Sequence, residues 1–408
     1  MKESIVITGM GAVTPLGLGV RAFWKGLVEG KSGINTIHSF DSDELAVQIA
    51  GEVKDFNPGD HMPIDLVRKT DPFMQFAYIA AEEALRDSKL TVEPENTGIT
   101  MGTAMSGIAT IAYTQEALTG ASHKKVGPRF IPKILGNIAA AHIAITHNIQ
   151  GPSLTVSTAC ASGGDAVSAA ADCIRLGRAE VMLAVGAESV LCPLVVYSLA
   201  NAKALSRHND DPAHASRPFD ALRDGFVIGE GGGALVLETE SHALKRGAAI
   251  YARLMGCGNG CDAYHITAPQ PEGLGAARCM ELALKDAGLK PEQIGYINAH
   301  GTATPKGDAA ETLAVKRVFG EHIPLVSSTK GATGHMMGAG GITELIACIQ
   351  AIRTETLPPT INLEHPDPDC DLDYIPLHSR KQHIDYAMSN AFGFGGQNSS
   401  VIVGRWNS

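Results

Sequence analysis

Short apolar runs alternate along this chain with longer, alanine-rich stretches that have the length and spacing of helices. In the first 240 residues the runs predict buried strands at 4–8, 97–101, 154–157, 181–186 and 233–237. Strands that are apolar on both faces, separated by helices, are typical of an α/β protein whose sheets are covered on both sides. The polar segment 206–223, rich in Asp, Asn, Pro and His, predicts an ordered surface loop rather than a linker.

A weak internal repeat suggests that the chain is built from two similar halves. Residues 82–90, followed by Pro94 and a strand near 98, resemble residues 281–289, followed by Pro291 and a strand near 295. In a second similarity, the strand–turn–helix pattern of residues 156–174 resembles that of residues 326–349. Because both similarities occur in the same order, we expect an N-terminal half at 1–245 and a C-terminal half at 246–408. Chance similarity between alanine-rich helices is the alternative.

Composition narrows the class of protein. The 408 residues are 44% hydrophobic, 19% charged and only 5% aromatic, so a large core of small aliphatic side chains is expected. Forty-five glycines without a Gly-X-Y period exclude collagen and indicate tight turns and close helix packing. The net charge of −10 provides no general field for a polyanion, which argues against nucleic acid as a partner.

The cysteines and the start of the chain bear on where the protein acts. Eight cysteines are scattered without Cys-x-x-Cys spacing, a pattern expected of reduced thiols in a cytoplasmic protein. The chain begins directly with a strand-like segment, with no apolar leader, and contains no uncharged apolar run of about 18 residues. We therefore expect a cytoplasmic protein that does not insert into a membrane.

The glycines at the end of the first predicted strand invite comparison with dinucleotide-binding loops. The segment GMG at 9–11 lacks the third glycine of that fingerprint, since Thr14 and Pro15 follow instead. No acidic residue closes a second strand about 20 positions later. A tight structural turn is therefore predicted at 9–11.

The strongest local signal for chemistry is a cysteine at a predicted strand-to-helix turn. The segment STACASGG at 157–164 surrounds Cys160 with small residues, and a helix is predicted over 163–176. Free amides and the positive end of that helix favour thiolate, so a lowered pKa and a nucleophilic Cys160 are expected. A buried structural cysteine is equally compatible with this segment alone.

Two histidine motifs in the second half favour the nucleophile. His300 lies in NAHGTATP at 298–305, directly after a predicted strand, and His335 lies in STKGATGHMMG at 328–338, which also contains Lys330. Any one of the 15 histidines could be an ordinary surface or core residue. Since strand ends of one sense gather at one rim of an α/β sheet, Cys160, His300 and His335 are expected to meet there.

These segments resemble the β-ketoacyl-acyl-carrier-protein synthases, the condensing enzymes of fatty-acid synthesis, and most closely the elongating type II enzymes. The resemblance covers nearly the whole chain. It includes VITGMG at 6–11, SRPFD at 216–220, RDGF at 223–226, DAYH at 262–265, PPTIN at 358–362 and NAFGFGG at 390–396. It implies a thiolase-like duplicated α/β fold of five layers, α-β-α-β-α, with two mixed sheets, and a homodimer.

The resemblance also implies a reaction: the condensation of malonyl-acyl-carrier protein with a cysteine-bound acyl chain, with loss of carbon dioxide. Cys160 would accept the acyl chain, and the backbone amides of Cys160 and Phe394 would form the oxyanion hole. His300 and His335 would stabilise the enolate formed from malonyl thioester. No cofactor and no metal are expected, because acyl groups arrive on the phosphopantetheine arm of acyl carrier protein.

Further residues receive supporting roles by the same resemblance. Lys330 would supply positive potential beside the histidines, and Glu344 would support that network; a surface lysine and a helix-face glutamate are the plain alternatives. Phe394, between two glycines, would act as a gate to the cysteine, unless it is an ordinary packing aromatic. Met105 would line the acyl pocket.

Acyl carrier protein is acidic in such systems, so basic residues are candidates for its docking surface, although each cluster could equally be an ordinary solvated one. In RHND at 207–210 the basic position is shifted by one from the family's usual TRND, which leaves the contact at this point open. The docking candidates are Arg68, Lys69, Lys124, Lys125, Arg129 and Arg207.

Related activities make different demands on the sequence. A thiolase needs a second catalytic cysteine near the C-terminus, and 392–399 contains none; the initiating synthase pairs its cysteine with His and Asn, whereas the second partner here is His335. A ketosynthase of a type II polyketide system has the same triad and stays open. A non-catalytic subunit akin to a chain-length factor would lack the nucleophile, and Cys160 is present.

Overall fold

The predicted alternation of strands and helices is present in a computed structural model of the chain, which describes residues 3–119 and 126–407. All five strands predicted in the first 240 residues coincide with observed ones. The N-terminal strands are β1 (Ile5–Thr14), β5 (Thr97–Gly102), β6 (Ser153–Val156), β7 (Val181–Glu188) and β8 (Gly231–Thr239). The C-terminal strands are β9 (Ala252–Cys261), β10 (Ile294–Asn298), β11 (Leu325–Ser327), β14 (Tyr386–Phe392) and β15 (Gln397–Gly404).

The two halves repeat one strand order. The N-terminal half runs β6-β5-β7-β8-β1 and the C-terminal half β11-β10-β14-β15-β9. In both, three parallel strands are followed by two antiparallel ones. This arrangement confirms the predicted duplication. The two mixed sheets are joined at one end, because β1 pairs antiparallel with β9 through Ile5, Val6 and Ile7, which makes them one eleven-stranded sheet within the described residues.

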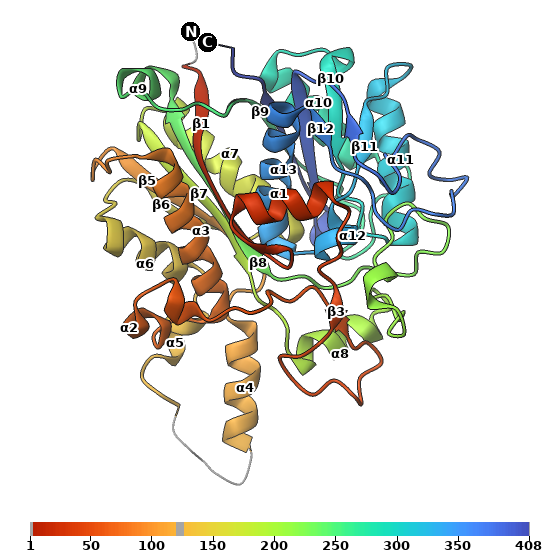
Figure 1. Ribbon diagram of the computed structural model, residues 1–408, viewed down its shortest axis with the longest axis horizontal. Helices are drawn as coiled ribbons and strands as arrows, with labels where there is room; N and C mark the ends of the chain where they lie inside the picture. The colour runs from red at the N-terminus through yellow and green to blue at the C-terminus, as the bar shows by residue number, and fades with distance from the viewer. Residues whose placement is uncertain (1–2, 120–125, 408) are drawn as a thin grey trace.

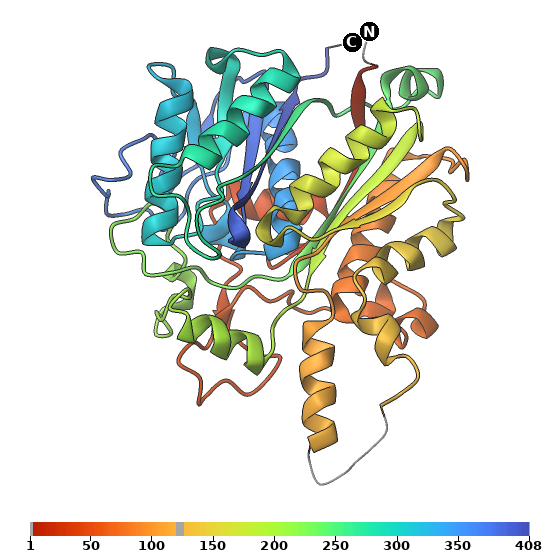
Figure 2. The ribbon, with the colours of Figure 1, turned by 180° about the vertical axis from the view of Figure 1, so that it is seen from behind.

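Helices form three of the five layers. Two helices lie between the sheet halves: α7 (Ser162–Arg175) contacts β7 and β15, and α13 (Gly340–Thr354) contacts β8 and β14 (Figures 1 and 2). The outer face of the N-terminal half is covered by α3 (Pro72–Ser88) and α6 (Asn137–His147). The outer face of the C-terminal half is covered by α10 (Leu274–Ala287), with α11 (Pro305–Phe319) beside it. The five-layered fold that the resemblance implied is therefore present.

The central layer explains the small residues of the chain. Almost every residue of α13 is buried, as expected for a helix enclosed on all sides. Where α7 passes α13, a Cβ added at Gly163 would lie 2.8 Å from the carbonyl oxygen of Gly338. Only glycine permits this approach, and it brings the segment after Cys160 against the segment after His335.

The segment 9–11 is not a turn, and that prediction was wrong. Gly9, Met10 and Gly11 lie within β1, in extended backbone paired with β8. A Cβ at Gly11 would overlap the carbonyl oxygen of Ala80, and one at Gly9 that of Ala84, both in α3. The glycines therefore serve the packing of α3 on the sheet rather than a reversal of the chain.

The remaining elements are short or peripheral, and the segment 206–223 contains only a single 3-10 turn at Pro212–His214. Between residues 3 and 119, and between 126 and 407, no helix combines the length and apolarity that crossing a bilayer requires. The remaining helices are α1 (Val20–Val28), α2 (Ile64–Val67), α4 (Ile108–Thr119), α5 (Phe130–Ile134), α8 (Pro193–Asn201), α9 (Glu240–Lys245) and α12 (Lys330–Thr333). The remaining strands are β2 (Gly17–Leu18), β3 (Asn35–Thr36), β4 (Ile49–Ala50), β12 (Thr356–Leu357) and β13 (Arg380–Lys381).

Candidate active site

Cys160 lies in a sharp turn between β6 and α7. Ala159 has a left-handed backbone with φ of 51°, and one turn of 3-10 helix at Ala159–Ala161 precedes α7. Ser162 fixes this turn, since its Oγ accepts the N–H of Thr158 at 2.9 Å and donates to the carbonyl of Ala159 at 2.7 Å. The thiol is thereby held directly before the positive end of a 14-residue helix.

The two histidines predicted to join Cys160 do so, and both come from the other half of the chain. His335 follows α12, and its backbone N–H donates to the carbonyl of Val227 at 2.7 Å. Its Nε2 lies 2.9 Å from Cys160 Sγ. His300 follows β10, and its ring lies 5.3 Å from the His335 ring, nearly perpendicular to it at 85°. The site therefore forms only where the two halves meet.

Both imidazoles are neutral near pH 7. Burial lowers the pKa of His300 and of His335 well below its ordinary value, and the positive charge of Lys330 lowers both further. The Nδ1 atom of each ring is buried and has no hydrogen-bond partner among the described residues. A neutral imidazole has one N–H donor and one lone pair, so either ring can donate a hydrogen bond while carrying no charge.

The expectation of a lowered pKa for Cys160 was wrong. Burial raises the pKa of the thiol to about 11, while Lys330 and the N–H of Phe394 lower it only in part. The cysteine packs against an apolar cluster that includes Val196 and Phe226, from segments distant in sequence. In the resting site Cys160 is therefore a thiol, and the nearby Nε2 of His335 is a proton acceptor within hydrogen-bond distance.

Lys330 and Glu344 form a buried ion pair beside the histidines. Lys330 is 1% exposed, and its Nζ contacts Oε1 of Glu344 in α13. Burial raises the pKa of Glu344, and Lys330 opposes that shift. Lys330 is thus not a surface lysine, nor is Glu344 an exposed helix-face residue. The charge of Lys330 acts on Cys160, His300 and His335 alike, as their pKa shifts show.

A glutamate that sequence reasoning missed positions His300. Glu311, in α11, accepts the backbone N–H of His300 at 2.9 Å and that of Gly301 at 2.8 Å. Burial raises the pKa of Glu311 to about 7, although these two hydrogen bonds favour its ionised form. The one sign of this role in the sequence was the presence of an acidic residue on the buried face of α11.

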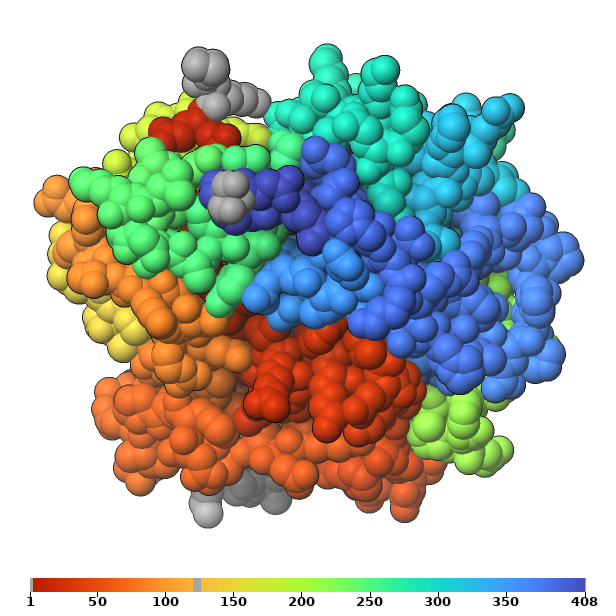
Figure 3. Space-filling view, turned by 45° about the horizontal axis from the view of Figure 1, so that its top comes forward, coloured from red at the N-terminus to blue at the C-terminus, as the bar shows by residue number. Residues whose placement is uncertain are grey.

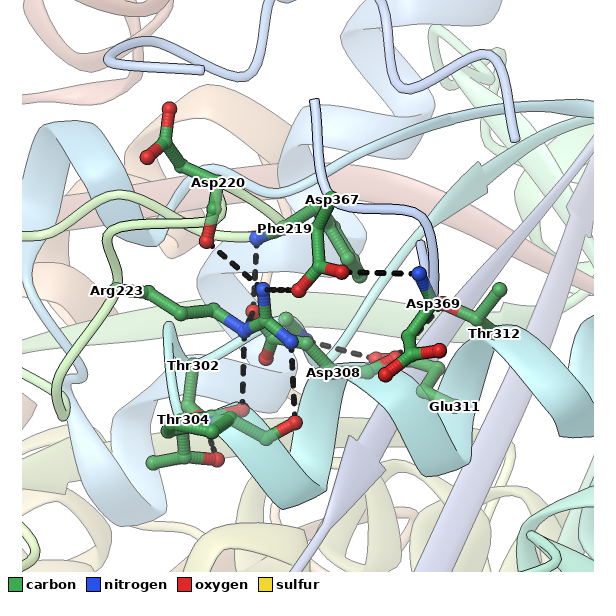
Figure 4. Close-up of polar contacts among 12 residues, drawn as sticks. Phe219, Asp220, Arg223, Thr302, Thr304, Asp308, Glu311, Thr312, Asp367 and Asp369 are labelled. Carbon is green, nitrogen blue, oxygen red and sulfur yellow. Dashed lines mark hydrogen bonds and ion pairs between the residues drawn. The ribbon is translucent and has the colours of Figure 1, made fainter. Parts of the chain in front are cut away.

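A buried arginine fixes the start of the same helix (Figure 4). The Arg223 guanidinium donates to the carbonyl of Pro305 at 3.1 Å and to that of Asp220 at 2.8 Å. It forms ion pairs with Asp308, at 3.4 Å, and with Asp367. Arg223 thereby connects the loop that follows His300 to two other segments. The motif RDGF contributed to the family resemblance, but sequence gave no sign of these contacts.

The segment around Phe394 closes over the cysteine turn. Gly393 approaches this turn so closely that a Cβ would lie 2.8 Å from the carbonyl oxygen of Thr158. Phe394 follows and is 41% exposed, and Gly395 and Gly396 both have left-handed backbones, with φ of 84° and 73°. Hydrogen bonding by the backbone N–H groups of Phe394 and Cys160 lowers the pKa of the Cys160 thiol, against the larger effect of burial. This geometry suits an oxyanion hole formed with the N–H of Cys160.

Met105 and Cys160 pack against the same apolar cluster. A second unpredicted carboxylate holds this segment: Glu188, which is fully buried, accepts the N–H groups of Met105 at 3.1 Å and of Gly338 at 3.2 Å. One carboxylate thus joins the Met105 segment to the segment that follows His335.

The basic docking candidates do not form one cluster in the described residues. Arg68 and Arg129 line the same groove, of about 530 Å³, together with Lys133. Lys69 is paired with Asp65. Arg207 is exposed in the segment 206–223 and does not line this groove. Lys124 and Lys125 lie outside the described residues.

The site also has a donor set that can ligate a metal. One ligand atom each from Cys160, His300 and His335 lie within 4.8 Å of one another. A thiolate and two imidazoles suit Zn²⁺ in chemistry, with a fourth position left open. They equally suit covalent catalysis, in which a nucleophile lies within hydrogen-bond distance of a base.

Comparison with known proteins agrees with this geometry. The family models "Beta-ketoacyl synthase, N-terminal domain" and "Beta-ketoacyl synthase, C-terminal domain" match residues 2–243 and 251–364. The chain is 45% identical to the 3-oxoacyl-[acyl-carrier-protein] synthase 2 of Synechocystis sp., over 99% of both chains. Among solved structures it is similar to a beta-ketoacyl synthase from Burkholderia phymatum, with a TM-score of 0.92, 36% identity and coverage of 99% and 100%. It is also similar to a type II polyketide ketosynthase in complex with its acyl-carrier protein, AntDE:AntF, with a TM-score of 0.90, 34% identity and full coverage of both chains.

Proposed function

This chain belongs to the β-ketoacyl synthase family, and we propose that it elongates acyl chains in fatty-acid biosynthesis. It condenses malonyl-acyl-carrier protein with an acyl group held on Cys160, and the products are 3-oxoacyl-acyl-carrier protein, carbon dioxide and free carrier protein. The observation that carries this proposal is the 2.9 Å contact between Cys160 Sγ and Nε2 of a neutral His335, with His300 beside it.

In the first half-reaction Cys160 takes the acyl chain. As Sγ attacks the thioester carbon of acyl-carrier protein, the thiol proton passes to Nε2 of His335, the acceptor within reach. The bond from the carbonyl carbon to the carrier sulfur then breaks, and that sulfur leaves with the proton. The N–H groups of Cys160 and Phe394 stabilise the oxyanion formed meanwhile. The site is left neutral, with a thioester on Cys160.

In the second half-reaction the same histidines act as hydrogen-bond donors. Once Cys160 is acylated, Nε2 of the neutral His335 no longer faces a thiol. In the tautomer that carries the ring proton on Nε2, it donates, with His300, to the thioester oxygen of malonyl-carrier protein. These bonds stabilise the enolate that forms as carbon dioxide leaves. The enolate carbon attacks the acyl-cysteine carbonyl, the bond from that carbon to Sγ breaks, and Cys160 departs as thiolate and takes up a proton from solvent. Lys330 stabilises the negative charge at each stage.

A condensation assay with purified protein tests the proposal. Malonyl-carrier protein is supplied with acyl-carrier proteins of graded chain length, and 3-oxoacyl product is measured for the parent chain, Cys160→Ser and Cys261→Ser. We expect Cys160→Ser to lose condensation and Cys261→Ser, which changes an exposed cysteine, to retain it. Elongation by Cys160→Ser at the parent rate would show that the assigned nucleophile is wrong.

A second candidate function is that of a ketosynthase in a type II polyketide system. It is favoured by the similarity to AntDE:AntF, whose 34% identity is lower than the 45% found with the Synechocystis enzyme. The same assay separates the two. Failure with every acyl chain, together with condensation from a polyketide primer, would favour the polyketide role.

Acyl carrier protein is the proposed partner, as the carrier protein in the AntDE:AntF complex is for that ketosynthase. The groove lined by Arg68, Arg129 and Lys133 offers three cations to an acidic partner. We expect Arg129→Gln to raise KM for acyl-carrier protein and to leave kcat unchanged, because docking lies outside the chemical step. Lys245→Gln, an exposed lysine outside this groove, is the matched control.

A homodimer is proposed from the free edge of the sheet. Among the described residues β6 pairs only with β5, which leaves its other edge open. Leu154 on this strand is 44% exposed, and Ile145 on the neighbouring α6 is 79% exposed. Pairing with a second copy would cover the open edge. Light scattering should give twice the chain mass for the parent and a lower mass for Leu154→Lys.

No bound cofactor is proposed, because the carrier protein's phosphopantetheine arm delivers both substrates. A cytoplasmic location is proposed because the nucleophile must stay reduced. All eight cysteines fall within the described ranges and are free.

A further inference from the structure

A second groove, of about 510 Å³, lies between the two halves of the chain. One side is formed by α1 and α3 of the N-terminal half, and the other by Tyr251 and the last turns of α13. These segments meet on the face shown in Figure 3, where α1 is red, the end of α3 orange, the segment near residue 250 green and α13 blue. None of the active-site residues lines this groove.

Three cations line the groove, and two of them, Arg21 and Arg353, make no ion pair with another described residue. Arg21 makes no hydrogen bond or ion pair with another described residue, and Lys25, one turn further along α1, lies 3.8 Å from Glu29. Arg353, from α13, lies over the Tyr251 ring at 4.3 Å and makes no ion pair within the described ranges. All three are exposed at the groove.

The two carboxylates in the groove are already engaged. Glu83 accepts the backbone N–H groups of Ala12, at 2.9 Å, and Val20, at 3.0 Å, one on each oxygen. Asp87 accepts the N–H of Met10 at 3.0 Å and the hydroxyl of Tyr251 at 2.8 Å. These oxygens keep their charge but are occupied by donors of the protein itself. Three cations therefore stand against two carboxylates in the groove lining, which leaves an excess of positive charge. The groove therefore favours an anionic ligand.

An aromatic surface lies beside the cations. Trp24 packs one part of its side chain on the core and leaves the rest in the groove, half-buried. Its indole N–H has no hydrogen-bond partner among the described residues. Tyr251 and the Arg353 guanidinium form a second flat surface. A planar ring can stack on such surfaces, and a phosphate suits the planar donors of arginine.

We propose that this groove binds a small anion that combines a planar aromatic ring with phosphate, in the manner of a purine nucleotide. The ring lies on Trp24, and the phosphates contact Arg21, Lys25 and Arg353. The volume lies within the usual range of small-molecule sites, about 300–1,000 Å³. The ligand would contact α13 about two to three turns beyond Glu344 and join it to α1 of the other half.

The chain offers a direct optical test, because it contains only two tryptophans, Trp24 and Trp406. Trp406→Phe leaves Trp24 as the sole tryptophan, and ADP is then titrated while Trp24 fluorescence is followed. We expect saturable quenching. Adding Arg353→Gln or Arg21→Gln should weaken the apparent affinity about 10-fold, because each removes one charge-assisted contact with phosphate. Arg178→Gln, an exposed arginine outside the groove, should leave it unchanged.

Fragments of the probe separate the two parts of the recognition. Adenosine and inorganic phosphate should each bind at least about 10-fold more weakly than ADP, since each lacks one of the two contacts. Thermal unfolding is measured in parallel, and ADP should raise Tm of the parent but not of Arg353→Gln. Absence of quenching at millimolar ADP, or equal affinity in Arg353→Gln and Arg178→Gln, overturns the proposal. The assay requires no catalysis, so its failure leaves the proposed condensation reaction untouched.

Discussion

The raised pKa of Cys160 predicts how its alkylation by iodoacetamide depends on pH. With a pKa of about 11, about one molecule in a thousand carries the thiolate at pH 8, compared with roughly a quarter for an unperturbed cysteine of pKa about 8.5. The thiolate of a weaker acid is the better nucleophile, and this raises the reaction rate of each Cys160 thiolate about 10-fold. Cys160 should therefore react about 20-fold more slowly than an unperturbed thiol at pH 8.

The assay follows alkylation at each cysteine by mass spectrometry of peptides, with the exposed Cys261 as a reference in the same sample. Because the acid form dominates below the pKa, the logarithm of the Cys160 rate should rise by about one for each pH unit between 7 and 10. Restricted access of the reagent would lower every rate equally, so the slope, rather than the absolute rate, carries the test.

A rate plateau between pH 6 and 8 would refute the reasoning. It would mean that a thiolate is already present, stabilised by the helix end or by proton transfer to His335, and that these effects outweigh burial. The variant Lys330→Met provides a second check. Since Lys330 lowers the pKa of Cys160, its removal should slow alkylation further and leave the slope unchanged. Faster alkylation in this variant would contradict the assigned sign of the Lys330 effect.

Three further predictions follow from packing and from the donor set of the site. Lys330→Met should lower the free energy of unfolding in guanidinium by about 3–5 kcal/mol, because it leaves Glu344 buried without its partner. The double variant Lys330→Met/Glu344→Met should recover much of that loss. Equal instability of the single and double variants would contradict this reasoning. Gly11→Ala should lower the free energy of unfolding by about 2–3 kcal/mol, because the added Cβ forces α3 from the sheet. Gly260→Ala should leave stability nearly unchanged, because a Cβ there has no neighbour closer than 3.9 Å. Equal losses of stability in the two variants would disprove the packing argument. Micromolar Zn²⁺ should inhibit condensation and protect the active-site thiol from alkylation, reversibly on addition of EDTA, and unchanged alkylation would exclude ligation there.

The meeting of Cys160, His300 and His335 could be predicted because it depends on local patterns and one topological rule. Each motif marks the end of an apolar strand, and parallel strands of an α/β sheet end at the same rim. The correspondence between the two halves could likewise be predicted from the repeated helix–turn–strand patterns in the sequence. These features are encoded in segments of about ten residues, which a single sequence shows directly.

Burial by distant segments could not be predicted in the same way. Sequence places Cys160 at a helix start, which favours thiolate, but the apolar cluster and the Phe394 loop that desolvate it come from elsewhere in the chain. Glu311 and Glu188 accept backbone N–H groups of other segments of the chain, so neither spacing nor residue type distinguishes them from surface glutamates. The turn predicted at the glycines of β1 was wrong for a related reason. These glycines are needed for close contact with α3, and not for a reversal of the backbone.

The place of β15 in the sheet has a consequence for synthesis of the protein. This strand, Gln397–Gly404, lies between β14 and β9, so it forms the interior of the C-terminal half although it follows both of its neighbours in the chain. A nascent chain that has not yet reached β15 already contains Cys160, His300 and His335. In that chain β9 and β14 cannot be joined, because the strand that pairs with both is missing. The reactive thiol is therefore made more than 230 residues before the strand that completes the half supplying His300 and His335.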